Sequence, residues 1–179
     1  MKTSITLFLL MFISASILGQ QTIITKLNEN GKLTGQLITE LKGKTAEQIY
    51  KKSEEWIAYT FTNTESVTQA KLESKMLRLI GVSQSALGPL MGFNFDLFYQ
   101  IQIDIKEGRI RFTVTELKQV SQSSPYTKIA LELMYKKGKL KKNKRFIKLK
   151  NQIDETLSSI QQSLISHIIG KEKILKDDW

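Results

Sequence analysis

The feature that most constrains the fold is a pair of alternating segments in the middle of the chain. In residues 93–106 apolar side chains occupy every second position, and residues 109–118 continue the alternation after a turn at Glu107-Gly108. A period of two is typical of β-strands that bury one face. In the second segment the inward positions Ile110, Phe112 and Val114 are apolar, and Glu116 would be the next. The sequence therefore predicts a long antiparallel hairpin with one face on a core.

The N-terminal part of the chain predicts a second hairpin followed by a helix. Residues 22–27 and 32–40 flank Asn30-Gly31, a dipeptide that tolerates positive φ and favours a tight turn. Thr45-Ala46-Glu47-Gln48 has the form of a capping box, which begins a helix. Apolar residues then recur at three- and four-residue spacing, and Trp56 among them is expected to anchor the core.

Another pair of strands is expected between this helix and the central hairpin. Residues 67–72 and 76–82 are short apolar-polar runs on either side of a turn at 73–75. Gly81 within the second run indicates a bulge or a close approach of the backbone to a neighbour. Residues 83–92 contain two glycines and a proline, so we expect a loop there.

The C-terminal part predicts helices. Residues 126–135 suggest a short helix, and residues 146–168 carry the apolar stripe of a long amphipathic helix that ends at Gly170. Its start is open between two positions. A start at Lys144 places cations against the positive end of the helix dipole, whereas a start at Asn151 places acidic residues there.

The first nineteen residues predict export. Lys2 is followed by an apolar run at 5–13 and by small and polar residues around Gly19, the organisation of a signal peptide cleaved after Gly19. A transmembrane anchor is the alternative, but it needs ~20 predominantly apolar residues, and this stretch is shorter. We therefore expect a signal peptide at 1–19 and one domain at 20–179 that is periplasmic or secreted. The chain has no cysteine, so that domain must be stable without disulfides.

Positive charge is concentrated in one short segment. The chain has 27 Lys and Arg residues against 17 Asp and Glu residues, a formal net charge of +10 at pH 7. Residues 136–150 include no acidic residue and carry nine of the positive charges: Lys136, Lys137, Lys139, Lys141, Lys142, Lys144, Arg145, Lys148 and Lys150. Such runs usually stay solvated, so one interpretation is an exposed segment that aids solubility. The other is a surface for an anionic partner.

For an exported chain, that partner would be an anionic membrane surface or an acidic glycan in the envelope or outside the cell. Apolar residues, among them Phe146 and Ile147, interleave with the lysines, so part of the run could lie on a membrane with its apolar side down. Nucleic acid is not expected as a partner, because export would remove the chain from the cytoplasm.

The residues that most catalytic and metal sites require are scarce. His167 is the only histidine and cysteine is absent, so a Cys/His metal site or a Ser-His-Asp triad lacks its partners. No glycine-rich segment has the spacing of a phosphate-binding loop. The adjacent acids Glu54-Glu55 and Asp154-Glu155 indicate solvated helix faces rather than a converging catalytic pair. The sequence therefore favours a protein that is not an enzyme and needs no cofactor.

The order of these elements resembles a known family. A helix with Tyr50 and Trp56, a strand with Leu79-Ile80-Gly81, and a hairpin with Gly108-Arg109 and Arg111 are similar to the secreted bacterial family called domain of unknown function 4468, common in Bacteroidetes, with a TATA-binding-protein-like (TBP-like) fold. The resemblance covers about residues 35–119 and leaves a helical extension at about 126–170. It implies a curved antiparallel sheet with helices on one face. It carries no known activity, so no catalytic residue is transferred.

A sheet covered by helices on one face leaves the other face for a partner. The outward positions of the central hairpin include Phe98, Arg109 and Arg111, and Asp104 is expected to pair with one of the two arginines. Phe98 would indicate a binding face if exposed, and a second covering layer is the alternative. We therefore expect an exported α+β protein with a long C-terminal amphipathic helix, acting as a binding or interaction module of unknown ligand. The alternative is a peripheral envelope protein that binds anionic lipid or glycan through residues 136–150.

Overall fold

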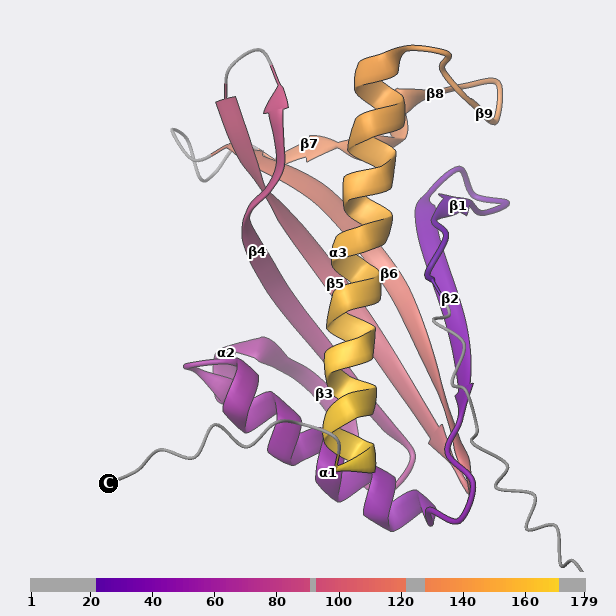
Figure 1. Ribbon diagram of the computed structural model, residues 1–179, viewed down its shortest axis with the longest axis vertical. Helices are drawn as coiled ribbons and strands as arrows, with labels where there is room; N and C mark the ends of the chain where they lie inside the picture. The colour runs from indigo at the N-terminus through magenta and orange to yellow at the C-terminus, as the bar shows by residue number, and fades with distance from the viewer. Residues whose placement is uncertain (1–21, 91–92, 122–127, 171–179) are drawn as a thin grey trace, which may run out of the picture.

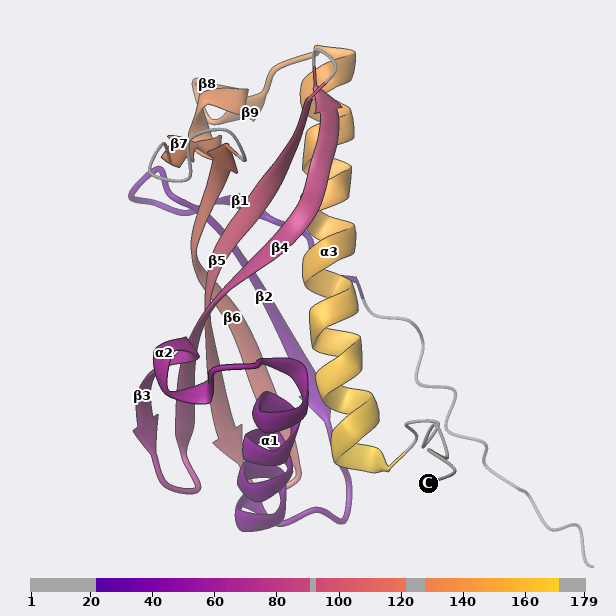
Figure 2. The ribbon, with the colours of Figure 1, turned by 90° about the vertical axis from the view of Figure 1, so that its left-hand side faces the viewer.

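The computed structural model describes residues 22–90, 93–121 and 128–170, and the predicted signal peptide lies outside them. An antiparallel sheet forms one layer, and helices α1 (Ala46–Thr60) and α3 (Lys144–Ile169) cover one of its faces (Figures 1 and 2). The strand order is β1-β2-β6-β5-β4-β3, and β7 also pairs with β6. The predicted α+β class, with helices on one face of an antiparallel sheet, is confirmed.

The predicted central hairpin is formed by β5 (Phe93–Lys106) and β6 (Arg109–Ser121). Its inward side chains are buried against the helices, among them Ile103 and Phe112, each 0% exposed. The alternation does not continue to Glu116, because the register shifts after Gln100 and leaves one extra residue on β6. Leu117 is therefore the buried side chain, and Glu116 lies on the other face.

The predicted N-terminal hairpin is confirmed in β1 (Lys26–Leu27) and β2 (Leu33–Glu40). Its first strand is shorter than expected, because the backbone N–H groups of Ile23 and Thr25 donate to Ser158 Oγ and Asp154 Oδ1 of α3 instead of to a neighbouring strand. The first half of β6 pairs with β2, and the second half pairs with β7 (Lys128–Ala130).

Strands β3 (Thr68–Leu72) and β4 (Met76–Leu90) form the predicted third pair, but the loop expected at 83–92 is wrong. Strand β4 continues along β5 to Leu90, across two register shifts. Leu87 in this stretch is fully buried, and Gln152 of α3 bonds both backbone polar groups of Gly88. These contacts stabilise an extended backbone, although the glycine and proline content of this stretch predicts a loop. Residues 91–92 lie outside the described residues.

Helix α1 begins with the predicted capping box, in which Thr45 Oγ1 accepts from the Gln48 backbone N–H. Trp56 is 1% exposed, and its indole N–H donates to Ser163 Oγ of α3 at 3.0 Å. The predicted core anchor thus also joins the two helices. A single short helix, α2 (Thr64–Val67), connects α1 to β3.

The prediction of a short helix at 126–135 is wrong for the residues of this segment that the structure describes. The chain forms β7, a 3₁₀ turn η1 (Leu131–Met134) and a small hairpin of β8 (Tyr135–Lys136) and β9 (Lys139–Leu140). The Glu132 carboxylate accepts from the Leu33 backbone N–H, and Leu131 and Met134 are buried. These contacts with β2 and the core fix the 3₁₀ turn. Residues 126 and 127 lie outside the described residues.

Helix α3 starts at Lys144, the first of the two open alternatives. The Asn143 side chain caps it by accepting from the Arg145 backbone N–H at 2.8 Å. Leu149, which lies between the two alternative starts, is 4% exposed. The burial of its side chain and the cap together offset the unfavourable charge at the helix start. The helix ends as expected at Gly170, whose φ is +71°.

Candidate functional site

The basic run, residues 136–150, folds into two elements at one end of the long axis of the molecule (Figure 1). We call this the basic end: the β8–β9 hairpin and the first turns of α3, residues 136–148. Seven of its cations are exposed: Lys136, Lys137, Lys139, Lys142, Lys144, Arg145 and Lys148. Within the described ranges none of the seven belongs to an ion pair, so the basic end carries uncompensated positive charge.

Two of the nine predicted cations have other roles. Lys150 forms an ion pair with Asp154, and both side chains are mostly buried, at 13% and 14% exposed. Asp154 also accepts from the backbone N–H and the hydroxyl of Thr25, so the expectation of a solvated Asp154 is wrong. Lys141 lies over the Phe146 ring, 5.3 Å from its centroid. Neither lysine is as available to a partner as the other seven.

The electrostatics of the basic end are unfavourable to the fold. Lys136 and Lys139 are directly opposite each other in the small hairpin, and like charges at such positions repel. The first turn of α3 has no acidic residue, so Lys144 and Arg145 add to the positive end of the helix dipole. A bound anion would relieve both repulsions.

The apolar residues of the run divide between the core and the surface. Leu149 is buried, and Leu140 and Phe146 pack against the core. Ile147 is 43% exposed, so the expected apolar side on a membrane is reduced to this residue. Leu133 of η1 is 64% exposed and lies at the same end of the molecule. It was missed because the sequence placed it within a helix.

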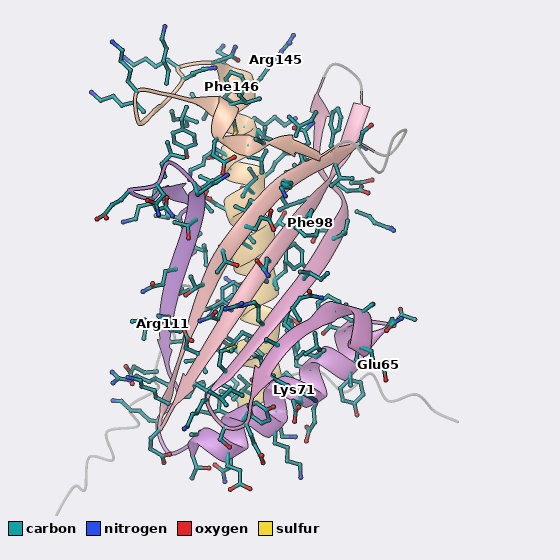
Figure 3. The ribbon with its side chains drawn as sticks, turned by 180° about the vertical axis from the view of Figure 1, so that it is seen from behind. Glu65, Lys71, Phe98, Arg111, Arg145 and Phe146 are labelled. Carbon is teal, nitrogen blue, oxygen red and sulfur yellow. The ribbon has the colours of Figure 1, made fainter. Side chains whose placement is uncertain are left out.

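The sheet face opposite the helices, which we call the open face, has no described helix over it (Figure 3). Phe98 lies there directly opposite Lys118, whose ammonium is 6.0 Å from the ring centroid. Phe98 is half-buried rather than bare. Lys118 is one of the residues that cover its ring.

Polar side chains form a bonded row across the open face. Arg111 donates through Nε to Asp104 Oδ2 at 2.9 Å, and its Nη2 is 2.8 Å from the same oxygen. Gln102 joins Asp104 to Arg78 by two further hydrogen bonds. The predicted pairing of Asp104 across the hairpin is thus confirmed for Arg111, and Arg109 forms no ion pair in the described part of the chain.

A hollow of about 210 Å³ lies on the open face beside the turn of the central hairpin. The side chains around it carry three cations and one carboxylate. They are Ile38, Asp104, Lys106, Arg109, Ile110 and Arg111. It brings together the two predicted arginines with Lys106 and Ile38, which sequence analysis missed because strand register alone decides which side chains meet there.

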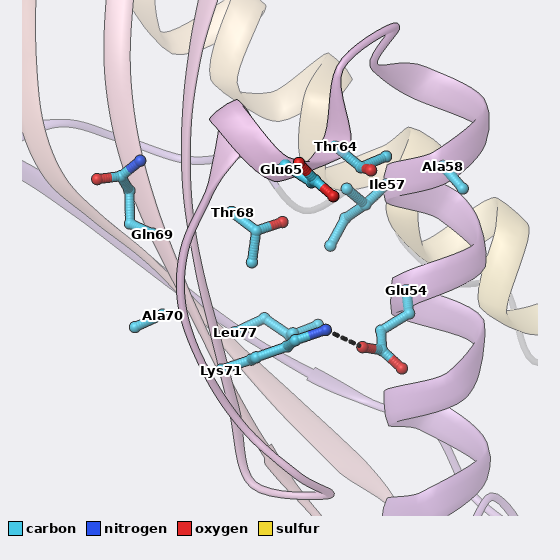
Figure 4. Close-up of a pocket in the computed structure, with 10 residues that line it drawn as sticks. All are labelled: Glu54, Ile57, Ala58, Thr64, Glu65, Thr68, Gln69, Ala70, Lys71 and Leu77. Carbon is cyan, nitrogen blue, oxygen red and sulfur yellow. Dashed lines mark hydrogen bonds and ion pairs between the residues drawn. The ribbon is translucent and has the colours of Figure 1, made fainter.

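A larger and more open hollow, of about 480 Å³, lies between α1, α2 and β3 (Figure 4). Its floor includes Ile57 and Leu77, both buried. Lys71 Nζ lies 3.4 Å from Glu54 Oε1 at one end, and Glu65 from α2 lies at the other. The opposite charges of the first two residues compensate each other, so this hollow has no excess of positive charge.

His167 lies beside Glu55, with 3.7 Å between Nε2 and Oε2, and only 8% of its side chain is exposed. A hydrogen bond from Lys52, assisted by the charge of Lys52 and more weakly by His167, holds the pKa of Glu55 below its ordinary value.

Within the described ranges, no three His, Cys, Asp or Glu side chains could hold a metal ion together. No helix in the same ranges is long and apolar enough to cross a membrane.

Comparison with known proteins identifies the part of the chain that carries the open face. Residues 36–119 match the family model described as a domain of unknown function (DUF4468) with TBP-like fold. These residues, which we call the DUF4468 domain after the model, resemble that family. The expected resemblance at 35–119 is therefore confirmed, and the matched residues include Phe98, Arg109 and Arg111.

Two solved structures resemble this chain over most of its length. A DUF4468 family protein from Bacteroides ovatus has a TM-score of 0.65 at 15% identity, over 84% of this chain and 91% of that chain. A TBP-like protein from Parabacteroides distasonis has a TM-score of 0.57 at 11% identity, over 80% of this chain and 94% of that chain. No curated protein matches the chain. These similarities show the fold, and the basic end lies beyond the residues that match the family model.

Proposed function

We propose that this chain is an exported, non-catalytic binding module that attaches to an anionic surface through its basic end. The observation that carries the proposal is the group of seven exposed cations at one end of the molecule, none of them in a described ion pair. A cluster of this kind attracts anionic surfaces over about a Debye length. Export, which the first nineteen residues predict, would place the basic end among envelope lipids and glycans.

Exposed apolar side chains favour a lipid surface over a glycan. Leu133 and Ile147 lie at the same end as the cations and are 64% and 43% exposed. Apolar side chains among cations strengthen attachment to a bilayer by entering the boundary between headgroups and acyl chains, whereas a hydrated glycan offers them little. Because the basic end is one extreme of the long axis, the open face would remain accessible to a second ligand (Figure 1).

Sedimentation with vesicles that contain anionic lipid tests this proposal. We expect binding that weakens as salt is raised, and a loss on the order of 100-fold when Lys137, Lys144 and Arg145 are all changed to Gln, because each cation near such a surface contributes about 1 kcal/mol. The matched control changes Lys42, Lys51 and Lys75 to Gln, three exposed lysines outside the basic end.

The control variant should bind the same vesicles as the unchanged chain does. Equal losses in the two triple variants would mean that net charge alone drives attachment, and no loss in either would contradict the proposal. A soluble acidic glycan in place of vesicles distinguishes the two surfaces. Binding to it with equal strength, and no effect of Leu133→Ser on vesicle binding, would favour the glycan.

A further inference from the structure

The hollow on the open face is bordered by cations that repel one another. Lys106 and Arg109 are directly opposite each other next to the hairpin turn, an arrangement that is unfavourable without an anion between or above them. Both are exposed, and neither belongs to an ion pair among the residues that the structure describes. Glu40 is paired with Arg109 in register from the β2 side, but it forms no ion pair with it and does not line the hollow.

Two further acidic residues near these cations, Asp104 and Glu107, already have partners of their own. Asp104 accepts from Arg111 and from Gln102, and Glu107 in the turn accepts from the Ala46 backbone N–H at 3.0 Å. The Glu107 side chain is therefore held at the start of α1 and does not line the hollow. Three cations and one engaged carboxylate line the hollow, which leaves it with an excess of positive charge.

The hairpin turn beside the hollow is fixed by two backbone hydrogen bonds to residues 41–44. The Gly108 N–H donates to the Lys44 carbonyl at 3.0 Å, and the Gly108 carbonyl accepts from the Leu41 N–H at 2.7 Å. Arg111 is held in turn by Asp104 through two of its nitrogens. A cation that is held in place before binding loses less entropy when an anion arrives, and among the three cations of the hollow this applies to Arg111.

We infer that this hollow binds the oxyanion, a carboxylate or a phosphate, of a small ligand. Arg109 and Lys106 would donate charge-assisted hydrogen bonds, which are stronger than bonds between neutral groups. Ile38 is 48% exposed on one wall and offers an apolar contact to the rest of the ligand. The volume of about 210 Å³ accommodates the anion and a few more heavy atoms of that ligand. This site belongs to the DUF4468 domain and does not depend on the basic end.

Titration of the chain with sodium phosphate and with sodium acetate, at constant ionic strength and followed by backbone amide NMR shifts, tests the inference. We expect saturable shifts at residues 106–111, and a loss of affinity of about tenfold in Arg109→Gln and in Lys106→Gln, because each removes a charge-assisted bond. The anion that saturates at the lower concentration identifies the phosphate or the carboxylate as the natural group.

Lys75→Gln is the matched control, because Lys75 is exposed but does not line the hollow. It should bind both anions as the unchanged chain does. Absence of saturation with either anion overturns the inference, as does an equal loss in Lys75→Gln and Arg109→Gln. The triple variant of the basic end should keep full affinity in this titration, so the inference and the proposed membrane attachment fail or succeed separately.

Discussion

Gly81 lies directly opposite Tyr99 in the β4–β5 pair, and the Tyr99 ring occupies the space that a side chain at position 81 would need. A Cβ on Gly81 would lie 2.6 Å from Cε2 of that ring, well inside contact distance. Tyr99 is 4% exposed, so the ring has no free space to move into. This is the close approach that the sequence indicated at Gly81.

We expect Gly81→Ala to lower the free energy of unfolding by about 1–3 kcal/mol, the usual cost of overpacking a filled core. Urea denaturation followed by circular dichroism measures it. Tyr99→Ala removes the ring, so the double variant should be destabilised by less than the sum of the two single variants. Additive effects would contradict the contact between the two positions.

Tyr99 also predicts how stability depends on alkaline pH. Burial raises the pKa of its hydroxyl above the ordinary value of 10.0, and a hydrogen bond with Ser83 lowers it by less. The folded chain thus keeps a proton that the unfolded chain releases above about pH 10, and stability should fall as the pH rises from there. Tyr99→Phe should make that fall less steep in unfolding curves recorded between pH 8 and 11.

The fall should not vanish in Tyr99→Phe, because burial also raises the pKa values of Tyr50 and Tyr135. Tyr59→Phe is the control, since the Tyr59 side chain is 82% exposed. An identical slope in Tyr99→Phe and Tyr59→Phe would rule out the buried phenol as its source.

Asp154 should contribute more to stability than its neighbour Glu155. It accepts from Thr25 and pairs with Lys150, whose side chain is mostly buried. Asp154→Ala leaves that cation without its partner, so we expect a loss of about 2–4 kcal/mol in the free energy of unfolding. Glu155→Ala, at an exposed position of the same helix, should change it by less than about 0.5 kcal/mol. Similar losses in the two variants would contradict this assignment.

The start of α3 should be more stable without its positive charge. Lys144→Glu replaces a cation with an anion next to the positive end of the helix dipole, so we expect a gain of about 0.3–1 kcal/mol, seen as a higher melting temperature. The same variant should bind anionic vesicles more weakly. Lys75→Glu makes the same charge change in a turn and should produce neither effect. A lower melting temperature in Lys144→Glu would show that the cations at this helix start are not unfavourable.

Most of the fold could be predicted because its elements have strong local patterns. Period two over residues 93–106, the capping box at Thr45 and the glycine after Asn30 each depend on neighbours in the sequence. The wrong predictions concern segments whose conformation is set by contacts with residues far away in the sequence. Leu87 is held in an extended strand by the core and by Gln152, and Glu132 is held in a 3₁₀ turn by Leu33.

For the candidate surfaces too, the sequence predicted the features that depend on neighbouring residues and missed those that depend on tertiary contacts. The nine cations of residues 136–150 were evident from the sequence. The ion pair that Lys150 forms with Asp154 and the exposure of Leu133 were not. On the open face, Arg109 and Arg111 were expected from the alternation. Their meeting with Ile38 of β2 follows from strand register, which no local pattern encodes.

By itself the sequence determined the fold class, the family resemblance and the concentration of charge, because composition, period and short motifs are properties of neighbouring residues. Only the tertiary structure decided where α3 begins, which cations are uncompensated, and that a positively charged hollow lies beside the hairpin turn. Those outcomes depend on burial and on pairing between residues far apart in the chain. Such contacts exist only after the sheet and its two helices have packed together.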